Sequence, residues 1–326
     1  MNLENFDLSC YNLTDLYNGE IAEVAELADA HDSGSCGVTR AGSNPALGTK
    51  KSLRIQSPKK GSGYTDPDFL VGRKKICRFG GERLVEVKFY DYPVLCGKAD
   101  EVRNHLIRLI EKGEKLFVVT LNSQIFLKAE QIPDYTEALK KASFHLPDGA
   151  GVVWAIKRHC NIDTDRIPGI DTMEYLCNES IKRGWSVYLL GAKPDVIKKA
   201  AEVLKSRGVK VVGYHHGYFE DQAPANEIRK LKPDLLFVGM GTPRQELWIY
   251  QHHNLPFKLA MGVGGSFDVI SGVKKRAPKL FQKLRLEWFY RWLNEPIARA
   301  RVPLDVMKFY FRVVRDGKNR NCEKIH

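Results

Sequence analysis

Residues 144–155 read FHLPDGAGVVWA. A short apolar run ends at Pro147, a single acid follows, and two glycines lead into the apolar spacing of a helix. This order predicts a strand, a tight turn and a helix, with Asp148 at the carboxyl end of the strand. Ligands bind at that edge of open α/β sheets, and glycine lets them approach the backbone. Asp148 is therefore a candidate functional residue; the alternative is that it caps the helix.

Strand and helix patterns alternate through the rest of residues 84–273. Helical spacing separates a series of short apolar runs, and glycine or proline punctuates many of them. Apolar strand-length runs occur at 116–121, 185–190, 209–212, 235–238 and 259–263. This alternation predicts an α/β fold, a Rossmann-like and mostly parallel sheet with helices on both faces.

Glycine or a small polar residue directly follows several of these predicted strands. Each alone is explained by a turn, but the carboxyl ends of parallel strands meet at one edge, so together they outline one crevice suited to a nucleotide or a sugar phosphate. The residues are Thr120, Asn122, Asp148, Gly149, Gly191, Gly239, Gly241, Gly264 and Gly265. The sequence contains no G-x-G-x-x-G fingerprint and no Walker loop, which argues against NAD and ATP as ligands.

Composition sets the outer limits of the interpretation. The chain has 326 residues, of which 43% are hydrophobic, and a net charge of +12. Its seven cysteines are scattered and form no Cys-x-x-Cys pair. This usage favours a reducing compartment and argues against a zinc site or a disulfide framework. The sequence has no uncharged apolar run long enough for a transmembrane helix.

Residues 1–83 differ in character from the rest of the chain. They carry eleven basic and eleven acidic residues and few strong apolar runs, as a disordered leader does. A second interpretation is a tRNA gene read as protein: residues 42–45 (GSNP) can be encoded by GGT-TCG-AAT-CCC, and residues 80–82 (GGE) by a ribosome-binding sequence. We expect a non-genuine or disordered extension, with the protein beginning near residue 84.

The C-terminal region, residues 274–326, is strongly basic. Twelve basic and three acidic residues lie between 274 and 315, so +9 of the net charge is found here. Leucine and tryptophan recur every four residues from Leu280 to Trp292. Basic and aromatic residues at helical spacing are typical of an interfacial helix on an anionic membrane. The alternatives are a helix that packs Trp288 on the body of the protein, and nucleic-acid binding. Pro296 and Pro303 are expected to break the region into short helices.

Six motifs together resemble a known family, the WecG/TagA/CpsF glycosyltransferases, over about residues 87–315. Each motif alone is weak, and their shared order and spacing make the resemblance strong. The motifs are TLN at 120–122, LPDG at 146–149, RIPGID at 166–171, HGYF at 216–219, GMGTPRQE at 239–246 and GVGGSFD at 262–268.

The resemblance implies an activity, and the residues fit it. Family members transfer an N-acetylmannosamine-type sugar from UDP to N-acetylglucosamine on undecaprenyl diphosphate, for teichoic acid, common antigen or capsule synthesis. An inverting transfer needs a base for the acceptor hydroxyl, and Asp148 matches the family's proposed base.

The resemblance also assigns the remaining candidate residues, and it implies no metal and no other cofactor. Thr120 and Asn122 match the sugar end of the pocket, and Arg166 is a cation for phosphate or the lipid diphosphate. The other expected donor-binding residues are Asp171, Gly191, Gly239, Gly241, Gln245, Gly264 and Asp268. In the family the basic tail covers the active site and contacts membrane, which makes candidate diphosphate ligands of Arg276, Arg285, Arg291, Arg299 and Arg301.

Two motifs that resemble metal sites are discounted. Asp163-Thr164-Asp165 is a D-x-D sequence, but it lies in a polar loop rather than after a strand. His215 and His216 are adjacent, and neighbouring residues of a strand point to opposite faces, which makes a poor chelate.

Two rival functions remain. A sugar-nucleotide-modifying enzyme such as an epimerase would usually need NAD and its fingerprint. A basic protein that binds membrane or nucleic acid without catalysis does not explain an acid at a strand end. We expect an enzyme at the cytoplasmic face of the plasma membrane, with a UDP-sugar, a lipid-linked acceptor and the membrane surface as partners, no nucleic acid, and possible homo-oligomers.

Overall fold

The computed structural model describes residues 84–278, 290, 293, 302–317 and 322–324. The predicted extension at residues 1–83 lies outside this part of the chain, as do Trp288, Trp292 and Pro296. The tRNA-gene hypothesis and the interfacial helix centred on the two tryptophans therefore stay predictions.

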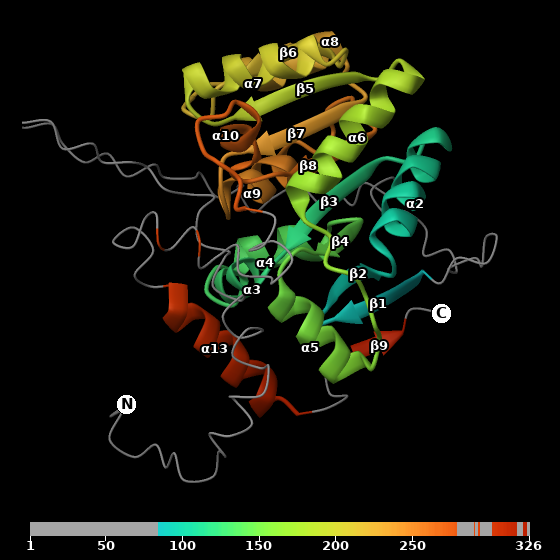
Figure 1. Cartoon of the computed structure of the whole chain (residues 1–326), viewed down its shortest axis with the longest axis vertical. Helices are drawn as coiled ribbons and strands as arrows, with labels where there is room; N and C mark the ends of the chain where they lie inside the picture. Colours follow the sequence, from blue (N-terminus) through green and yellow to red (C-terminus); the bar gives the residue numbers. More distant parts are fainter. Residues whose placement is uncertain (1–83, 279–289, 291–292, 294–301, 318–321, 325–326) are drawn as a thin grey trace, which may run out of the picture.

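The described residues form one nine-stranded sheet, in the order β6-β5-β7-β8-β3-β4-β2-β1-β9 (Figure 1). From β6 to β2 all neighbouring strands are parallel, whereas β1 is antiparallel to β2 and β9 is antiparallel to β1. The predicted α/β class and mostly parallel sheet are confirmed. The strands are β1 (Val85–Phe89), β2 (Tyr92–Cys96), β3 (Leu116–Leu121), β4 (Phe144–Pro147), β5 (Ser186–Gly191), β6 (Lys210–His215), β7 (Leu235–Gly239), β8 (Leu259–Gly262) and β9 (Cys322–Lys324).

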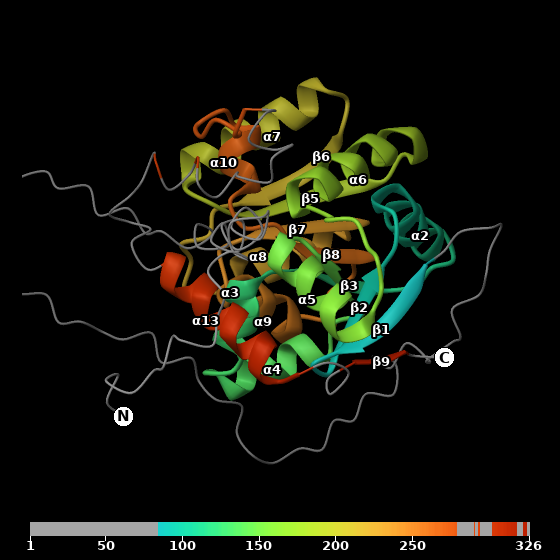
Figure 2. The same ribbon diagram turned by 60° about the horizontal axis from the view of Figure 1, so that its bottom comes forward.

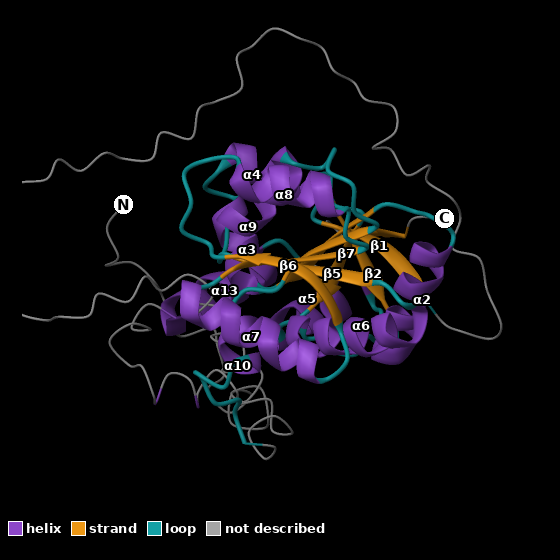
Figure 3. Ribbon diagram, turned by 90° about the horizontal axis from the view of Figure 1, so that it is seen from above, coloured by secondary structure: helices purple, strands orange, loops and turns teal. Residues whose placement is uncertain are grey.

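Side chains alternate between two hydrophobic cores, one on each face of the sheet. In β3, Phe117 and Val119 belong to the first core while Leu116 and Val118 belong to the second. Because successive side chains of a strand point to opposite faces, a strand that is apolar throughout is buried on both sides. Figure 3 shows α4, α8 and α9 on one side of the sheet and α6, α7 and α10 on the other.

The helices cover these two cores. The first core includes residues of α3 (Ser123–Ala129), α4 (Pro133–Lys140), α5 (Ala150–Cys160), α8 (Ala223–Leu231), α9 (Arg244–Gln251) and α13 (Val302–Arg315). The second includes residues of α2 (Ala99–Glu111), α6 (Gly169–Arg183), α7 (Pro194–Ser206) and α10 (Ser266–Ile270). Proline stands in the first turn of α4 and α7, where its missing N–H costs no helical hydrogen bond.

The end of the chain folds back onto the same body. Helix α13 contributes Val306 and Phe309 to the first core, and the Phe309 ring lies 5.3 Å from Phe126 of α3. Strand β9 then pairs with β1, as Figure 2 shows. Pro303, expected to break a helix, is the second residue of α13. Helix α13 therefore packs on the core, and strand β9 extends the sheet.

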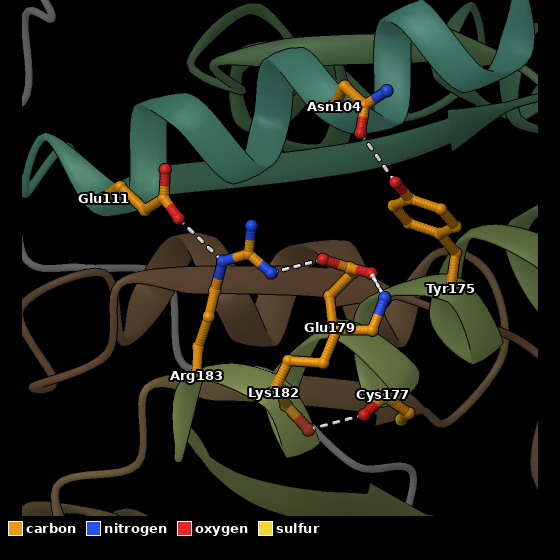
Figure 4. A network of polar contacts seen from close by, with 8 residues as sticks. Asn104, Glu111, Tyr175, Cys177, Glu179, Lys182 and Arg183 are labelled. Carbon is orange, nitrogen blue, oxygen red and sulfur yellow. Dashed lines mark hydrogen bonds and ion pairs between the residues drawn. The ribbon is translucent and has the colours of Figure 1, made fainter.

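Polar contacts join α2 to α6 (Figure 4). Arg183 donates to Glu111 of α2 at 2.6 Å and also bonds Glu179 within α6. The Tyr175 hydroxyl donates to Asn104 at 2.6 Å. Exposed pairs of this kind contribute about 0–1 kcal/mol each, so their main effect is geometric. They matter for the site because the first residue of α6, Gly169, packs on Thr120.

The cysteines of the described residues differ in their state. Cys160, the last residue of α5, is disulfide-bonded, whereas Cys96 and Cys177 are free and buried. Scattered spacing carries no information on which cysteines the fold brings together. Burial raises the pKa of both free thiols to about 12, so they are inert at neutral pH. Among the described residues, no helix is both long and apolar enough to cross a bilayer.

Candidate active site

Asp148 lies in the turn that joins β4 to α5. Its backbone N–H donates to the Leu121 carbonyl at 2.9 Å, which ties the turn to the end of β3. The N-cap of α5 is Gly149, one residue later, and it makes no side-chain capping bond. Asp148 is thus not the N-cap residue. Asp148 directly follows β4, at the carboxyl edge of the sheet, and this position was predicted.

Arg166 lies directly against this turn. Its Nε donates to the Asp148 carbonyl at 2.7 Å, and the next residue, Ile167, donates its N–H to the Pro147 carbonyl at 2.7 Å. The segment before α6 therefore continues alongside the end of β4. The guanidinium is thus held against the backbone of the turn that carries Asp148, and a guanidinium can bind a phosphate.

Thr120 is the penultimate residue of the neighbouring strand β3, and Asn122 directly follows it. The pairing of Leu121 with Pro147 brings Asn122 beside Asp148. Thr120 is 6% exposed, and its hydroxyl donates to the Gly262 carbonyl of β8 at 3.4 Å. Asn122 is the N-cap of α3, because its Oδ1 accepts the Ile125 N–H at 2.9 Å. Both side chains therefore make hydrogen bonds within the protein, at the edge where the family resemblance predicts the sugar to bind.

The glycines at the ends of β5 and β7 and after β8 let the backbones of these strands approach one another closely. A Cβ on Gly191, whose φ is +134°, would lie 2.2 Å from the Gly239 carbonyl oxygen. A Cβ on Gly239 would lie 2.7 Å from the Gly264 carbonyl oxygen. Only glycine fits such approaches, so three predicted donor-binding residues are brought together. Gly241, at φ +75°, forms the turn before α9.

Gln245 is 2% exposed, and both ends of its amide are engaged. Its Oε1 accepts the Gly264 N–H at 3.0 Å, and its Nε2 donates to Glu246 Oε1 at 2.6 Å. In this geometry Gln245 holds the turn after β8, whereas the sequence assigned it a bond to the donor. That bond stays a prediction.

Sequence reasoning missed the buried polar group behind Gln245. Glu246 is fully buried, and its Oε2 accepts the Tyr135 hydroxyl of α4 at 3.1 Å. Lys128 of α3 donates to the Thr242 carbonyl at 2.8 Å. Burial raises the pKa of Glu246 and lowers that of Lys128, and the charge of each opposes the shift of the other. Tyr135 and Glu246 are 111 positions apart, so no local pattern indicates the contact.

The acids of α6 and α10 lie against the start of the basic region. Asp171, in the first turn of α6, forms an ion pair with Arg276. The carbonyl of Asp268, in α10, accepts the Lys274 N–H at 2.9 Å. The side chain of Arg276 thus has a carboxylate partner at this edge, and its role as a diphosphate ligand stays a prediction. Arg285, Arg291, Arg299 and Arg301 lie outside the described residues.

The two motifs that resemble metal sites have other partners. Asp165 accepts the Ala99 N–H at the start of α2 and pairs with Lys98, and Asp163 pairs with Lys157 at 2.6 Å. The His215 and His216 rings are 4.5 Å apart rather than on opposite faces, because β6 ends at His215. Their Nδ1 atoms contact the His216 carbonyl and the Tyr218 N–H. No cluster of three or more His, Cys, Asp or Glu suited to a metal occurs in the described ranges.

These features define an α/β protein with a ligand site at the carboxyl edge of a parallel sheet. Comparison with known proteins identifies the family: a model of the glycosyl transferase WecG/TagA/CpsF family matches residues 87–323. The chain belongs to this family and is a glycosyltransferase.

Three curated relatives share the name N-acetylglucosaminyldiphosphoundecaprenol N-acetyl-beta-D-mannosaminyltransferase. The relative from Bacillus subtilis strain 168 is 37% identical over 231 residues, which cover 67% of this chain and 90% of the relative. That from Staphylococcus aureus strain MW2 is 42% identical over 189 residues, 57% of this chain and 74% of the relative. That from Bacillus spizizenii is 38% identical over 210 residues, 63% of this chain and 81% of the relative.

Proposed function

We propose that this chain transfers N-acetylmannosamine, or its uronic acid, from a UDP-sugar to N-acetylglucosamine on undecaprenyl diphosphate, for teichoic acid or surface polysaccharide synthesis. The names of the relatives support the transferred sugar and the acceptor. The observation that carries the proposal is the position of Asp148 directly after β4, with Arg166 held against its carbonyl, at the same edge of the parallel sheet as the glycines that end β5 and β7.

The chemistry follows from this arrangement. The Asp148 carboxylate takes the proton of the acceptor hydroxyl while the hydroxyl oxygen attacks the anomeric carbon of the donor sugar, so the configuration at that carbon inverts. The bond from that carbon to the UDP oxygen breaks, and UDP leaves as an anion. Arg166 and the backbone N–H groups at the strand ends stabilise the negative charge of the diphosphate. The proposed mechanism uses no metal.

Release of UDP by the full chain tests the proposal. We expect release from UDP-N-acetylmannosamine or from UDP-N-acetylmannosaminuronic acid, and only when undecaprenyl diphosphate-linked N-acetylglucosamine is present. UDP-N-acetylglucosamine is the matched control donor, because it differs from the first only in the configuration at C2. Activity should persist with excess EDTA. Release from neither donor, or equal release from the control, would contradict the proposal.

We further propose that the enzyme binds the cytoplasmic face of the plasma membrane peripherally. Helix α13 buries one face in the core, yet Leu304, Met307 and Phe311 are exposed at helical spacing on the same helix. Lys308 and Arg315 are exposed there too. An apolar stripe beside basic residues fits an anionic bilayer surface.

Vesicle co-sedimentation tests the membrane proposal. Met307→Asp in the full chain should weaken binding to vesicles of anionic phospholipid. The matched control is Ile181→Asp, which changes an exposed apolar residue of α6, 43% exposed against 48% for Met307. Equal binding by both variants would contradict a membrane role for α13.

A further inference from the structure

The fully buried carboxyl group of Glu246 lies behind the proposed donor site and has no assigned role. Two groups donate to it, from different helices: Gln245 Nε2 to Oε1 at 2.6 Å and the Tyr135 hydroxyl to Oε2 at 3.1 Å. Its main chain lies in α9, directly after the turn that contains Gly241. A buried carboxyl group is costly unless it is hydrogen-bonded, and here both oxygens are satisfied.

Glu246 determines which way the Gln245 amide points. A glutamine amide has an acceptor oxygen on one side and a donor NH2 on the other. With its NH2 held by Glu246, the oxygen of Gln245 faces the Gly264 N–H at 3.0 Å. The flipped amide would set its oxygen against the Glu246 carboxylate and its NH2 against the Gly264 N–H. Both contacts are repulsive, so one orientation is selected.

The consequence extends to the glycine edge. Gly264 has a φ of +50°. A Cβ on Gly239 would lie 2.7 Å from the Gly264 carbonyl oxygen. A Cβ on Gly262 would lie 2.8 Å from Gln245 Nε2 and 3.1 Å from Glu246 Oε1. The end of β8 therefore packs directly on the Gln245–Glu246 pair. We expect a change in that pair to move the turn after β8.

Lys128 holds the adjacent turn, between β7 and α9. Its Nζ donates to the Thr242 carbonyl at 2.8 Å, two residues before the donor-site helix begins at Arg244. The ammonium charge also favours the ionised form of Glu246. Side chains of α3, α4 and α9 thus support the turns after β7 and β8 together.

We propose that Glu246 is a positioning residue for the donor end of the site: it orients Gln245, which clamps Gly264, and Tyr135 and Lys128 support it. The identification of the ligand as a UDP-sugar rests on the proposed function. The clamp itself is a property of the fold, so it has a readout that is independent of turnover.

The test uses Glu246→Leu in the full chain, with Glu246→Gln as the conservative variant. Leucine removes the acceptor for the Gln245 NH2. The donor KM should then rise by about 10- to 100-fold, the size of effect that a displacement of about 1 Å has, while the acceptor KM stays within about 2-fold. Glutamine accepts from Gln245 and donates to the Tyr135 oxygen, so Glu246→Gln should restore most of the donor KM.

Hydrogen exchange of the Gly264 amide provides the turnover-independent readout. Exchange should be faster in Glu246→Leu than in the wild type, and slow again in Glu246→Gln. Tyr135→Phe should raise it to a smaller extent. The matched control is Tyr188→Phe, because the buried Tyr188 hydroxyl donates to Glu227 at 2.6 Å away from this edge.

The outcomes separate the two proposals. Unchanged Gly264 exchange and unchanged donor KM in Glu246→Leu overturn the positioning role. If that variant does not fold, Tyr135→Phe decides: exchange equal to that of Tyr188→Phe overturns the role. Absence of turnover by the wild type, with faster Gly264 exchange in Glu246→Leu, contradicts the proposed function and leaves the clamp established.

Discussion

Replacement of Phe309 by alanine should destabilise the whole protein, because α13 is part of the core. The Phe309 side chain is fully buried, and its ring lies edge-on to that of Phe126, 5.3 Å away. Burial of a phenylalanine side chain contributes about 1.5–3 kcal/mol, and an aromatic pair adds about 0.5–1.5 kcal/mol. The cavity left behind adds to the loss, and we expect a loss of about 3–5 kcal/mol in the free energy of unfolding.

The assay is urea unfolding of the full chain, followed by circular dichroism and by tryptophan fluorescence. Phe311→Ala is the control, since the same residue type two positions later is 39% exposed. It should change the free energy of unfolding by less than about 0.5 kcal/mol. A loss below about 1 kcal/mol for Phe309→Ala, or equal losses for both variants, would refute the reasoning that α13 is docked.

Two further predictions concern pH and the glycine edge. Burial lowers the pKa of His145 to about 3, so the neutral ring stabilises the fold above the unfolded pKa of about 6.5, and this stability is lost as the pH falls toward 3. Between pH 6.5 and pH 5 the wild type should therefore lose about 2 kcal/mol more than His145→Asn in urea unfolding; parallel losses would contradict this. Gly191→Ala places a Cβ 2.2 Å from the Gly239 carbonyl oxygen, so UDP affinity measured by calorimetry should fall by at least about 10-fold. Gly113→Ala should leave the affinity unchanged, because a Cβ at Gly113, whose φ is also positive, meets no atom within 4 Å.

The strands of the parallel sheet could be predicted because each is apolar on both faces and is punctuated by glycine. The first hairpin could not. Its turn residues, Tyr90 and Asp91, have φ values of +48° and +69°. Turns of this kind are usually signalled by Asn-Gly or Asp-Gly, and this pair is neither. Strand β9 has three residues and forms by pairing with the edge strand β1. A segment this short has no local sequence pattern that predicts a strand.

The candidate site was predictable where it depends on strand ends and not where it depends on distant contacts. Asp148 and the glycines follow from strand–turn patterns. The bonds of Gln245 to Gly264 and of Glu246 to Tyr135 join different elements. Composition gives no signal for them, and Glu246 on a helix is expected to be exposed. The sequence likewise gives no signal for the disulfide bond of Cys160.

The most direct test of the account compares Asp148→Asn with Asp163→Asn in the sugar transfer assay. Asp163 is an aspartate of the D-x-D sequence, with its side chain 86% exposed. Loss of the general base should lower the turnover of Asp148→Asn by about 10²- to 10⁴-fold with UDP affinity kept, whereas Asp163→Asn should match the wild type. Full turnover by Asp148→Asn, or an equal loss in Asp163→Asn, would contradict the assignment of Asp148 as the base.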